Sequence, residues 1–173
     1  ILVSGRKTKL QNRDLIEQCD LVVFAVPIQH TDSVIEECIA CSRPDQIWAD
    51  ITSVKQQPIA AMLGSKAEVC GLHPLFGPLP VITGQPFIYC PERISEASLS
   101  SVLALLRDFD LIEMTATDHH DIMGAVQCVS HLSDFVMGET LRDSGLDFET
   151  IWRVSSPSYR VKLQVMGRMF AQN

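Results

Sequence analysis

The segment 20-DLVVFAVP-27 constrains the fold more than any other part of the chain. It is a short, valine-rich, almost wholly apolar run that ends at a proline. A strand of a parallel sheet has this composition, because helices cover both faces of such a sheet. A helix is predicted over 31–42, where Ser33 and Glu36 form a possible capping box. The chain is therefore expected to contain βαβ units.

The alternation of strand and helix continues for about a hundred residues and then stops. Further strands are predicted over 46–51, 69–72, 86–90 and 111–114, and further helices over 56–63 and 95–109. From residue 117 only helices are predicted, over 117–142, 147–153 and 157 to the end. We therefore expect a Rossmann-like, doubly wound, mostly parallel α/β domain at 1–116 and the start of an α-helical domain at 117–173.

The N-terminal part of the α/β domain is expected to be missing. A doubly wound domain normally opens with a strand, a glycine-rich turn and a helix. No G-x-G-x-x-G motif occurs in the sequence, and the apolar residues 1–3 are predicted to be the second strand. The helical domain is likewise expected to be cut short, because its last helical pattern is interrupted at Asn173.

Composition excludes several classes of function. The 173 residues carry a net charge of −7 without a basic stripe, so no nucleic-acid partner is expected. No apolar run is long enough to span a membrane, and the six cysteines lie mostly in apolar stretches. Reduced thiols in a cytoplasmic protein are the simplest explanation. The C-x-x-C pair Cys38 and Cys41 falls well along a predicted helix, and we expect neither redox nor metal function from it.

Three successive predicted strands end in segments that could border a ligand site. The three strand ends are Val26-Pro27, 50-DITSVK-55 and His73-Pro74. Ligands of open α/β sheets bind beyond the carboxyl ends of the strands. If the three strands are neighbours, Ser53, Lys55 and His73 converge on one crevice. The alternative is that Asp50 and Ser53 only cap the helix that follows.

The predicted helical part offers a second set of polar residues. On a regular α-helix, His120, Gln127, His131 and Asp134 fall on one stripe. The two histidines are three turns apart, about 16 Å, so one metal ion cannot bridge them and no metal site is predicted. Arg160, Gln164 and Arg168 form another stripe, which is either a solvated face or a grip for carboxylates.

Five segments together resemble one enzyme family. They are 20-DLVVFAVPIQHTDSVIEE-37, 50-DITSVK-55, 71-GLHPLFGP-78, 118-DHHDIMGAVQCVSHL-132 and 155-SSPSYRVKLQVMGRMFAQ-172. They resemble prephenate dehydrogenases, especially the bacterial type often fused to chorismate mutase. The resemblance implies oxidative decarboxylation of prephenate to 4-hydroxyphenylpyruvate with NAD or NADP, in tyrosine biosynthesis. It also implies a homodimer formed through the helical domain.

The resemblance assigns roles to individual residues. It implies that His73 is the catalytic histidine, which interacts with the ring hydroxyl, and that Ser53 lies beside it. The implied substrate-binding residues are Arg168, Arg160, His120 and His131, with His119 as the alternative to His120.

The cofactor is expected at the strand ends Val26-Pro27 and Ser53. An NAD-selecting domain carries Asp or Glu near the end of its second strand. This chain has Ser4, Arg6 and Lys7 there, which could hold a 2′-phosphate and favour NADP slightly over NAD. Three alternative functions stay open: an arogenate dehydrogenase, a non-catalytic remnant or dimerisation module with the same fold, and a Rossmann-type dehydrogenase for an unrelated hydroxy acid.

Overall fold

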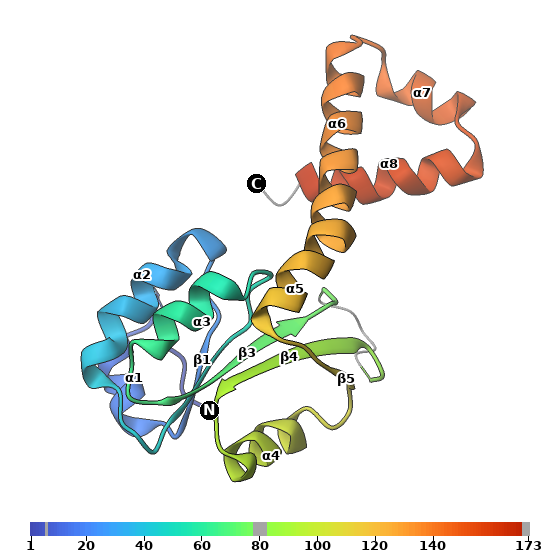
Figure 1. The fold of residues 1–173 in the computed structure, drawn as a ribbon. Helices are drawn as coiled ribbons and strands as arrows, with labels where there is room; N and C mark the ends of the chain where they lie inside the picture. Colours follow the sequence, from blue (N-terminus) through green and yellow to red (C-terminus); the bar gives the residue numbers. More distant parts are fainter. Residues whose placement is uncertain (6, 78–82, 171–173) are drawn as a thin grey trace. The chain divides into compact units, whose positions relative to one another are not determined.

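The computed structural model describes residues 1–5, 7–77 and 83–170, without the side chains of residues 168 and 169. The chain divides into two compact units, Ile1–His120 and Asp121–Asn173. The first unit contains α1 (Asn12–Gln18), β1 (Leu21–Phe24), α2 (Ile28–Cys38), β2 (Ile47–Asp50), α3 (Gln56–Leu63), β3 (Glu68–Pro74), β4 (Pro86–Arg93), α4 (Glu96–Leu105) and β5 (Asp110–Glu113) (Figure 1). It also contains most of α5 (Ala116–Met123).

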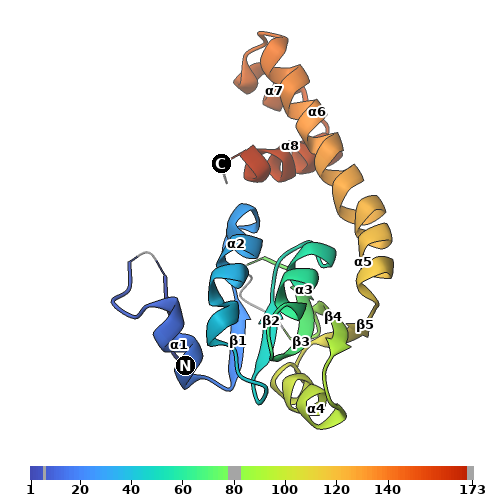
Figure 2. The ribbon, with the colours of Figure 1, turned by 60° about the vertical axis from the view of Figure 1, so that its left-hand side comes forward.

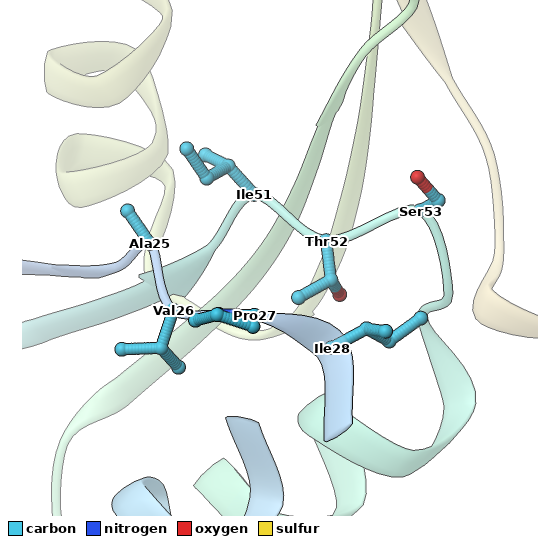
Figure 3. A pocket seen from close by; sticks show the side chains of 7 residues that line it. All are labelled: Ala25, Val26, Pro27, Ile28, Ile51, Thr52 and Ser53. Carbon is cyan, nitrogen blue, oxygen red and sulfur yellow. The ribbon is translucent and has the colours of Figure 1, made fainter. Parts of the chain in front are cut away.

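The five strands form one sheet in the order β1-β2-β3-β4-β5 (Figures 1 and 2). All neighbouring pairs are parallel except β3 and β4. The carboxyl ends of β1, β2 and β3 therefore meet at one edge of the sheet. At this edge the segment after β1 faces the segment after β2 (Figure 3). The predicted mostly parallel α/β fold is confirmed.

Helices cover both faces of this sheet. Successive residues of a strand point to opposite faces. Cys70 and Leu72 of β3 pack with Val102 of α4, so α4 covers their face. Gly71 points to the other face, where the position of its missing Cβ is 2.7 Å from Cδ1 of Ile59 in α3. His73 shares this α3 face, two residues after Gly71.

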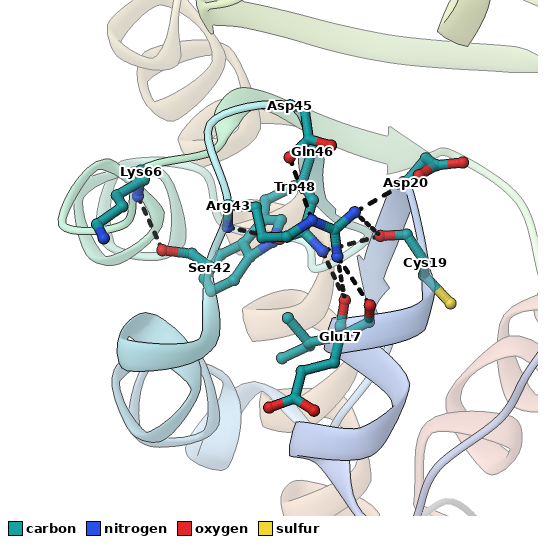
Figure 4. Close-up of polar contacts among 10 residues, drawn as sticks. Glu17, Cys19, Asp20, Ser42, Arg43, Asp45, Gln46, Trp48 and Lys66 are labelled. Carbon is teal, nitrogen blue, oxygen red and sulfur yellow. Dashed lines mark hydrogen bonds and ion pairs between the residues drawn. The ribbon is translucent and has the colours of Figure 1, made fainter.

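Arg43 and Gln46 fix the first helix against the start of β2 (Figure 4). The guanidinium of Arg43 donates to the carbonyl of Glu17 at 2.9 Å and to that of Ile16 at 3.2 Å. The buried amide of Gln46 donates to the carbonyls of Ile16 and Cys19. Carbonyls at a helix end lack partners within the helix, so these side chains complete the C-terminus of α1.

The second unit is helical. It contains a π-helical segment (Gly124–Cys128), α6 (Val129–Asp143), α7 (Phe148–Val154) and α8 (Pro157–Phe170). Helices α6 and α8 pack together, and the ring of Phe170 lies so close to Gly138 that a Cβ there would be 2.1 Å from it. No helix in the described ranges is long and apolar enough to cross a membrane.

Four details differ from the sequence-based expectation. Residues 1–3, predicted to be a strand, are exposed and do not pair with any strand of the described sheet. Helix α2 begins at Ile28, so Ser33 lies inside it and bonds to the carbonyl of His30 instead of capping. Strand β3 continues through His73, because His73 pairs with Ile88 of β4.

The fourth difference concerns the long helix predicted over 117–142. Its first turn is capped by the hydroxyl of Thr115, which accepts from the N–H of Asp118. The π-helical segment interrupts it, and a π-helix does not keep the 3.6-residue spacing. The uninterrupted α-helix from which the stripe through His120 and His131 was predicted is therefore absent between these residues. The first compact unit extends to residue 120.

Candidate active site

A buried ion pair lies where β2 ends. Lys55 and Asp50 are both fully buried, and the Lys55 ammonium donates to Oδ2 of Asp50. The same oxygen accepts from the backbone N–H of Thr52 at 3.0 Å and from its hydroxyl. Burial lowers the pKa of Lys55, and Asp50 opposes this effect. Oδ1 of Asp50 is buried without a hydrogen-bond partner among the described residues.

The ammonium of Lys55 also reaches the next strand. It donates to the carbonyl of Leu72 at 2.7 Å, one residue before His73. The last paired residues of β2 and β3 are Asp50 and Gly71. Leu72 thus lies one residue beyond the last residue of β3 that pairs with β2. The ammonium of Lys55 donates the hydrogen bond to its carbonyl that a longer β2 would have donated.

Two buried histidines meet beside this pair. His73 is 3% exposed and His119 of α5 is 1% exposed, and Nδ1 of His73 lies 2.9 Å from Nε2 of His119. Burial, then His119, then Lys55 lower the pKa of His73 to about 4. Burial and then Lys55 lower the pKa of His119 to about 4, while Asp50 acts in the opposite direction. Both imidazoles are therefore neutral at pH 7.

The contact between the two rings couples their tautomers. A neutral imidazole has one N–H and one acceptor nitrogen, so one ring donates and the other accepts. If His73 donates from Nδ1, its Nε2 is an acceptor and the proton of His119 is on Nδ1. That Nδ1 is buried without a hydrogen-bond partner among the described residues. If His119 donates instead, Nε2 of His73 carries a proton and cannot act as a base.

An open pocket of about 380 Å³ lies at the carboxyl ends of β1 and β2 (Figure 3). Its lining consists of Ala25, Val26, Pro27, Ile28, Ile51, Thr52 and Ser53. Pro27 precedes the first turn of α2 and gives it no side-chain cap. The first N–H groups of a helix carry partial positive charge, which favours anionic groups beside them. Val26, Pro27 and Ser53, predicted to bind cofactor, thus line one pocket.

Ser4 and Lys7 of the N-terminal segment are not among the residues that line this pocket. The hydroxyl of Ser4 lies 2.9 Å from the carbonyl of Leu10 and 2.7 Å from Oδ1 of Asn12. Lys7 is exposed, and Arg6 lies outside the described residues. Their part in cofactor choice stays a prediction.

The predicted substrate residues of the helices occupy varied environments. His120 on α5 and His131 on α6 are both exposed. Arg160 donates to the carbonyl of Trp152 at 3.1 Å, and its guanidinium lies 5.2 Å from the centre of the Trp152 ring. This side chain therefore ties the start of α8 to α7. The side chain of Arg168 lies outside the described residues.

The sequence analysis did not identify three members of the buried cluster as site residues. His119 was only the alternative to His120, Asp50 was weighed as a helix cap, and Thr52 was not considered. The available signal was the spacing in 50-DITSVK-55, which puts two opposite charges beside a buried strand. Within the described parts of the chain, no group of three His, Cys, Asp or Glu side chains could hold a metal ion.

Comparison with known proteins decides the family. A family model described as the prephenate dehydrogenase nucleotide-binding domain matches residues 5–110. The chain belongs to the prephenate dehydrogenase family. The match covers more than half of the chain and confirms the resemblance predicted from its motifs. It includes the pocket, the ion pair and His73.

Individual relatives extend this likeness. The T-protein of Enterobacter agglomerans is 32% identical over 167 residues, which cover 94% of this chain and 44% of that protein. A probable arogenate/prephenate dehydrogenase of Methanocaldococcus jannaschii is 31% identical over 170 residues, or 94% of this chain and 38% of that protein. The chain thus spans less than half the length of these curated relatives.

A solved structure supports the fold. The prephenate dehydrogenase of Aquifex aeolicus, in complex with hydroxyphenyl propionate and NAD+, superposes with a TM-score of 0.63 at 18% identity. The match covers 86% of this chain and 62% of that one. At this identity the likeness concerns the fold alone.

Proposed function

We propose that this chain is part of a prephenate dehydrogenase that converts prephenate, with NAD or NADP, to 4-hydroxyphenylpyruvate and carbon dioxide. The observation that carries the proposal is the burial of His73 against His119 at the carboxyl edge of the sheet, which lowers the pKa of His73 to about 4. The reaction removes a hydride and a proton from one secondary alcohol. A neutral imidazole is a suitable acceptor for that proton.

His73 has the role of general base. It takes the hydroxyl proton of the substrate while the C–H bond of the same carbon breaks and a carbonyl forms. The ring carboxylate then leaves as carbon dioxide, and the electron pair it leaves behind makes the ring aromatic. The carbonyl oxygen becomes a phenol by taking a proton, which His73 returns. The two carboxylates of prephenate raise the pKa of His73 when they bind nearby, which makes it a stronger base.

His119 sets the tautomer that this role requires. His73 accepts a proton at Nε2 only if its Nδ1 donates to Nε2 of His119. The proton of His119 is then on Nδ1, which has no partner among the described residues. A buried donor without an acceptor is unfavourable, so we expect a water molecule or a substrate oxygen beside it.

The cofactor fits the pocket after β1 and β2. When bound, a nicotinamide dinucleotide accepts the hydride. A pocket of about 380 Å³ has room for part of such a molecule, and Val26, Pro27 and Ser53 would contact that part. The uncapped first turn of α2 suits a phosphate or an amide oxygen. The preference for NADP rests on the sequence, in which Ser4 and the basic Arg6 and Lys7 stand where an NAD-selecting domain carries an acid.

The substrate's two carboxylates require cations. Arg168 and Arg160 are the proposed partners, since a guanidinium binds a carboxylate through two parallel N–H groups. Arg160 already donates to main-chain carbonyls, so it has fewer N–H groups left for a substrate. His120 and His131 are exposed and stay proposed substrate contacts. A homodimer and a cytoplasmic location also stay predictions.

One assay separates the candidate functions. The full-length protein is given prephenate or arogenate with NAD or NADP, and reduced nicotinamide is followed by its absorbance. We expect prephenate-dependent reduction, with a higher kcat/KM for NADP than for NAD. Higher kcat/KM for arogenate would make it an arogenate dehydrogenase. If neither prephenate nor arogenate gives reduced nicotinamide, and circular dichroism shows that the protein is folded, the non-catalytic alternative would be supported.

A further inference from the structure

The buried ion pair between Lys55 and Asp50 has a large desolvation cost, and apolar residues could fill the same space without that cost. Both side chains are fully buried. Removing two charges from water costs several kcal/mol per ion in general, and apolar residues of similar size often stabilise a core as well or better. A buried pair is therefore weak evidence of a stability role. Its contacts suggest a different role.

Lys55 is linked to His73 through the main chain of β3. Its ammonium donates to the carbonyl of Leu72, the residue that precedes His73. Parallel pairing between β2 and β3 has ended one residue earlier, at Gly71. Lys55 therefore supplies the hydrogen bond on the side of β3 that β2 no longer reaches, while the other side of this segment, which carries His73, pairs with β4.

Gly71 provides the space that the stem of Lys55 needs. A Cβ at this position would lie 2.9 Å from Cδ of Lys55 and 2.7 Å from Cδ1 of Ile59. Real Cβ atoms essentially never come that close to another heavy atom. Because Gly71 has no side chain, the stem of Lys55 can pack directly against the main chain of β3.

The charge of Lys55 also acts on both histidines. It lowers the pKa of His73 and of His119, while Asp50 raises that of His119. The titratable groups that influence these rings and Lys55 are Asp50 of β2, Lys55, Cys70 of β3, Cys90 of β4, and His119 and His120 of α5. Burial raises the pKa of Cys70 to about 12 and that of Cys90 to about 11, so both thiols are neutral at pH 7.

We propose that Lys55, anchored by Asp50, is a positioning residue that helps to fix the end of β3 and thereby holds the imidazole of His73 in place. The proposal rests on the proposed function, since the base that Lys55 positions is the one assigned there. Lys55 itself is buried and takes no part in bonds to the substrate.

The test compares Lys55→Met with the double variant Asp50→Asn/Lys55→Met in the full-length protein. Methionine keeps the length of the side chain and removes the charge, and the double variant avoids an unpaired buried carboxylate. The control is Lys66→Met, because Lys66 is an exposed lysine of the same unit. The readouts are kcat and KM for prephenate across pH, and the pKa of His73 from NMR of its imidazole, assigned with His73→Gln.

The proposal predicts a specific pattern. In both Lys55 variants kcat falls about tenfold or more, since small displacements of a catalytic group are costly. KM for prephenate changes less than kcat. The pKa of His73 rises in Lys55→Met, because a neighbouring positive charge is lost. Lys66→Met retains wild-type values.

Two results would overturn the proposal, and neither depends on the other. A folded double variant with wild-type kcat would remove the positioning role. An unchanged pKa of His73 would remove the electrostatic role, and this measurement needs no substrate. If the wild-type protein turned over neither prephenate nor arogenate, the proposed function would fail while the NMR result still decided the influence of Lys55 on His73.

Discussion

The histidine pair predicts how stability depends on pH. Folding lowers the pKa of His73 from 6.5 to about 4, and that of His119 likewise. Between these values the unfolded chain binds more protons than the folded one, so acid favours unfolding. The contribution of each ring is fully present above pH 6.5 and is lost as the pH falls through 4. The full fall in pKa corresponds to about 3 kcal/mol per ring.

The assay is urea unfolding at a series of pH values from 7.5 to 4.5. Over this range each ring costs the wild type about 2–3 kcal/mol, because the unfolded chain is almost fully protonated at the lower end. His73→Gln keeps a polar side chain and removes one titrating ring, so the loss of stability on acidification should be smaller by about that amount. His30→Gln is the matched control, since His30 is exposed, and should follow the wild type. A pH dependence of His73→Gln equal to that of the wild type would refute the reasoning.

Two further predictions concern stability at neutral pH. Gly71→Ala puts a Cβ 2.7 Å from Cδ1 of Ile59 and should lower the free energy of unfolding in urea by about 1–3 kcal/mol. Gly77→Ala places its Cβ within 4 Å of no atom of the described residues and should change this free energy by less than about 0.5 kcal/mol. Equal effects of the two changes would contradict the close packing beneath β3. Gln46→Leu removes two hydrogen bonds to carbonyls at the end of α1 and should cost about 2 kcal/mol, measured as a fall in the thermal midpoint relative to the exposed control Gln57→Leu. An unchanged midpoint would mean that water replaces these bonds.

Local patterns were sufficient to predict most of the fold. The apolar run at 21–24 forms a strand with parallel pairing, as its composition indicates. Pro157 begins α8, where its fixed φ and missing N–H suit a first helical turn. Gly145 follows α6 with a φ of 65°, a conformation that glycine adopts without strain. In each case neighbouring residues along the chain hold the information.

The arrangement of the site depends on contacts that no local pattern contains. His73 and His119 are 46 residues apart in sequence, and nothing in either segment predicts that their rings touch. Lysines are almost never fully buried, so the usual expectation placed Lys55 at a crevice surface. Its burial follows from the register of β2 and β3 and from the missing side chain of Gly71. The family resemblance supplied His73 and Ser53, but it gave no reason to look at Asp50.

The measurement that tests the central claim most directly is the kcat of His73→Asn with prephenate and a saturating nicotinamide cofactor, in the full-length protein. Asparagine occupies a similar volume and cannot accept the hydroxyl proton. The account predicts a fall in kcat of about 10²-fold or more, the typical contribution of a general base, with a smaller change in KM. A kcat equal to that of the wild type would contradict the assignment of His73 as the base.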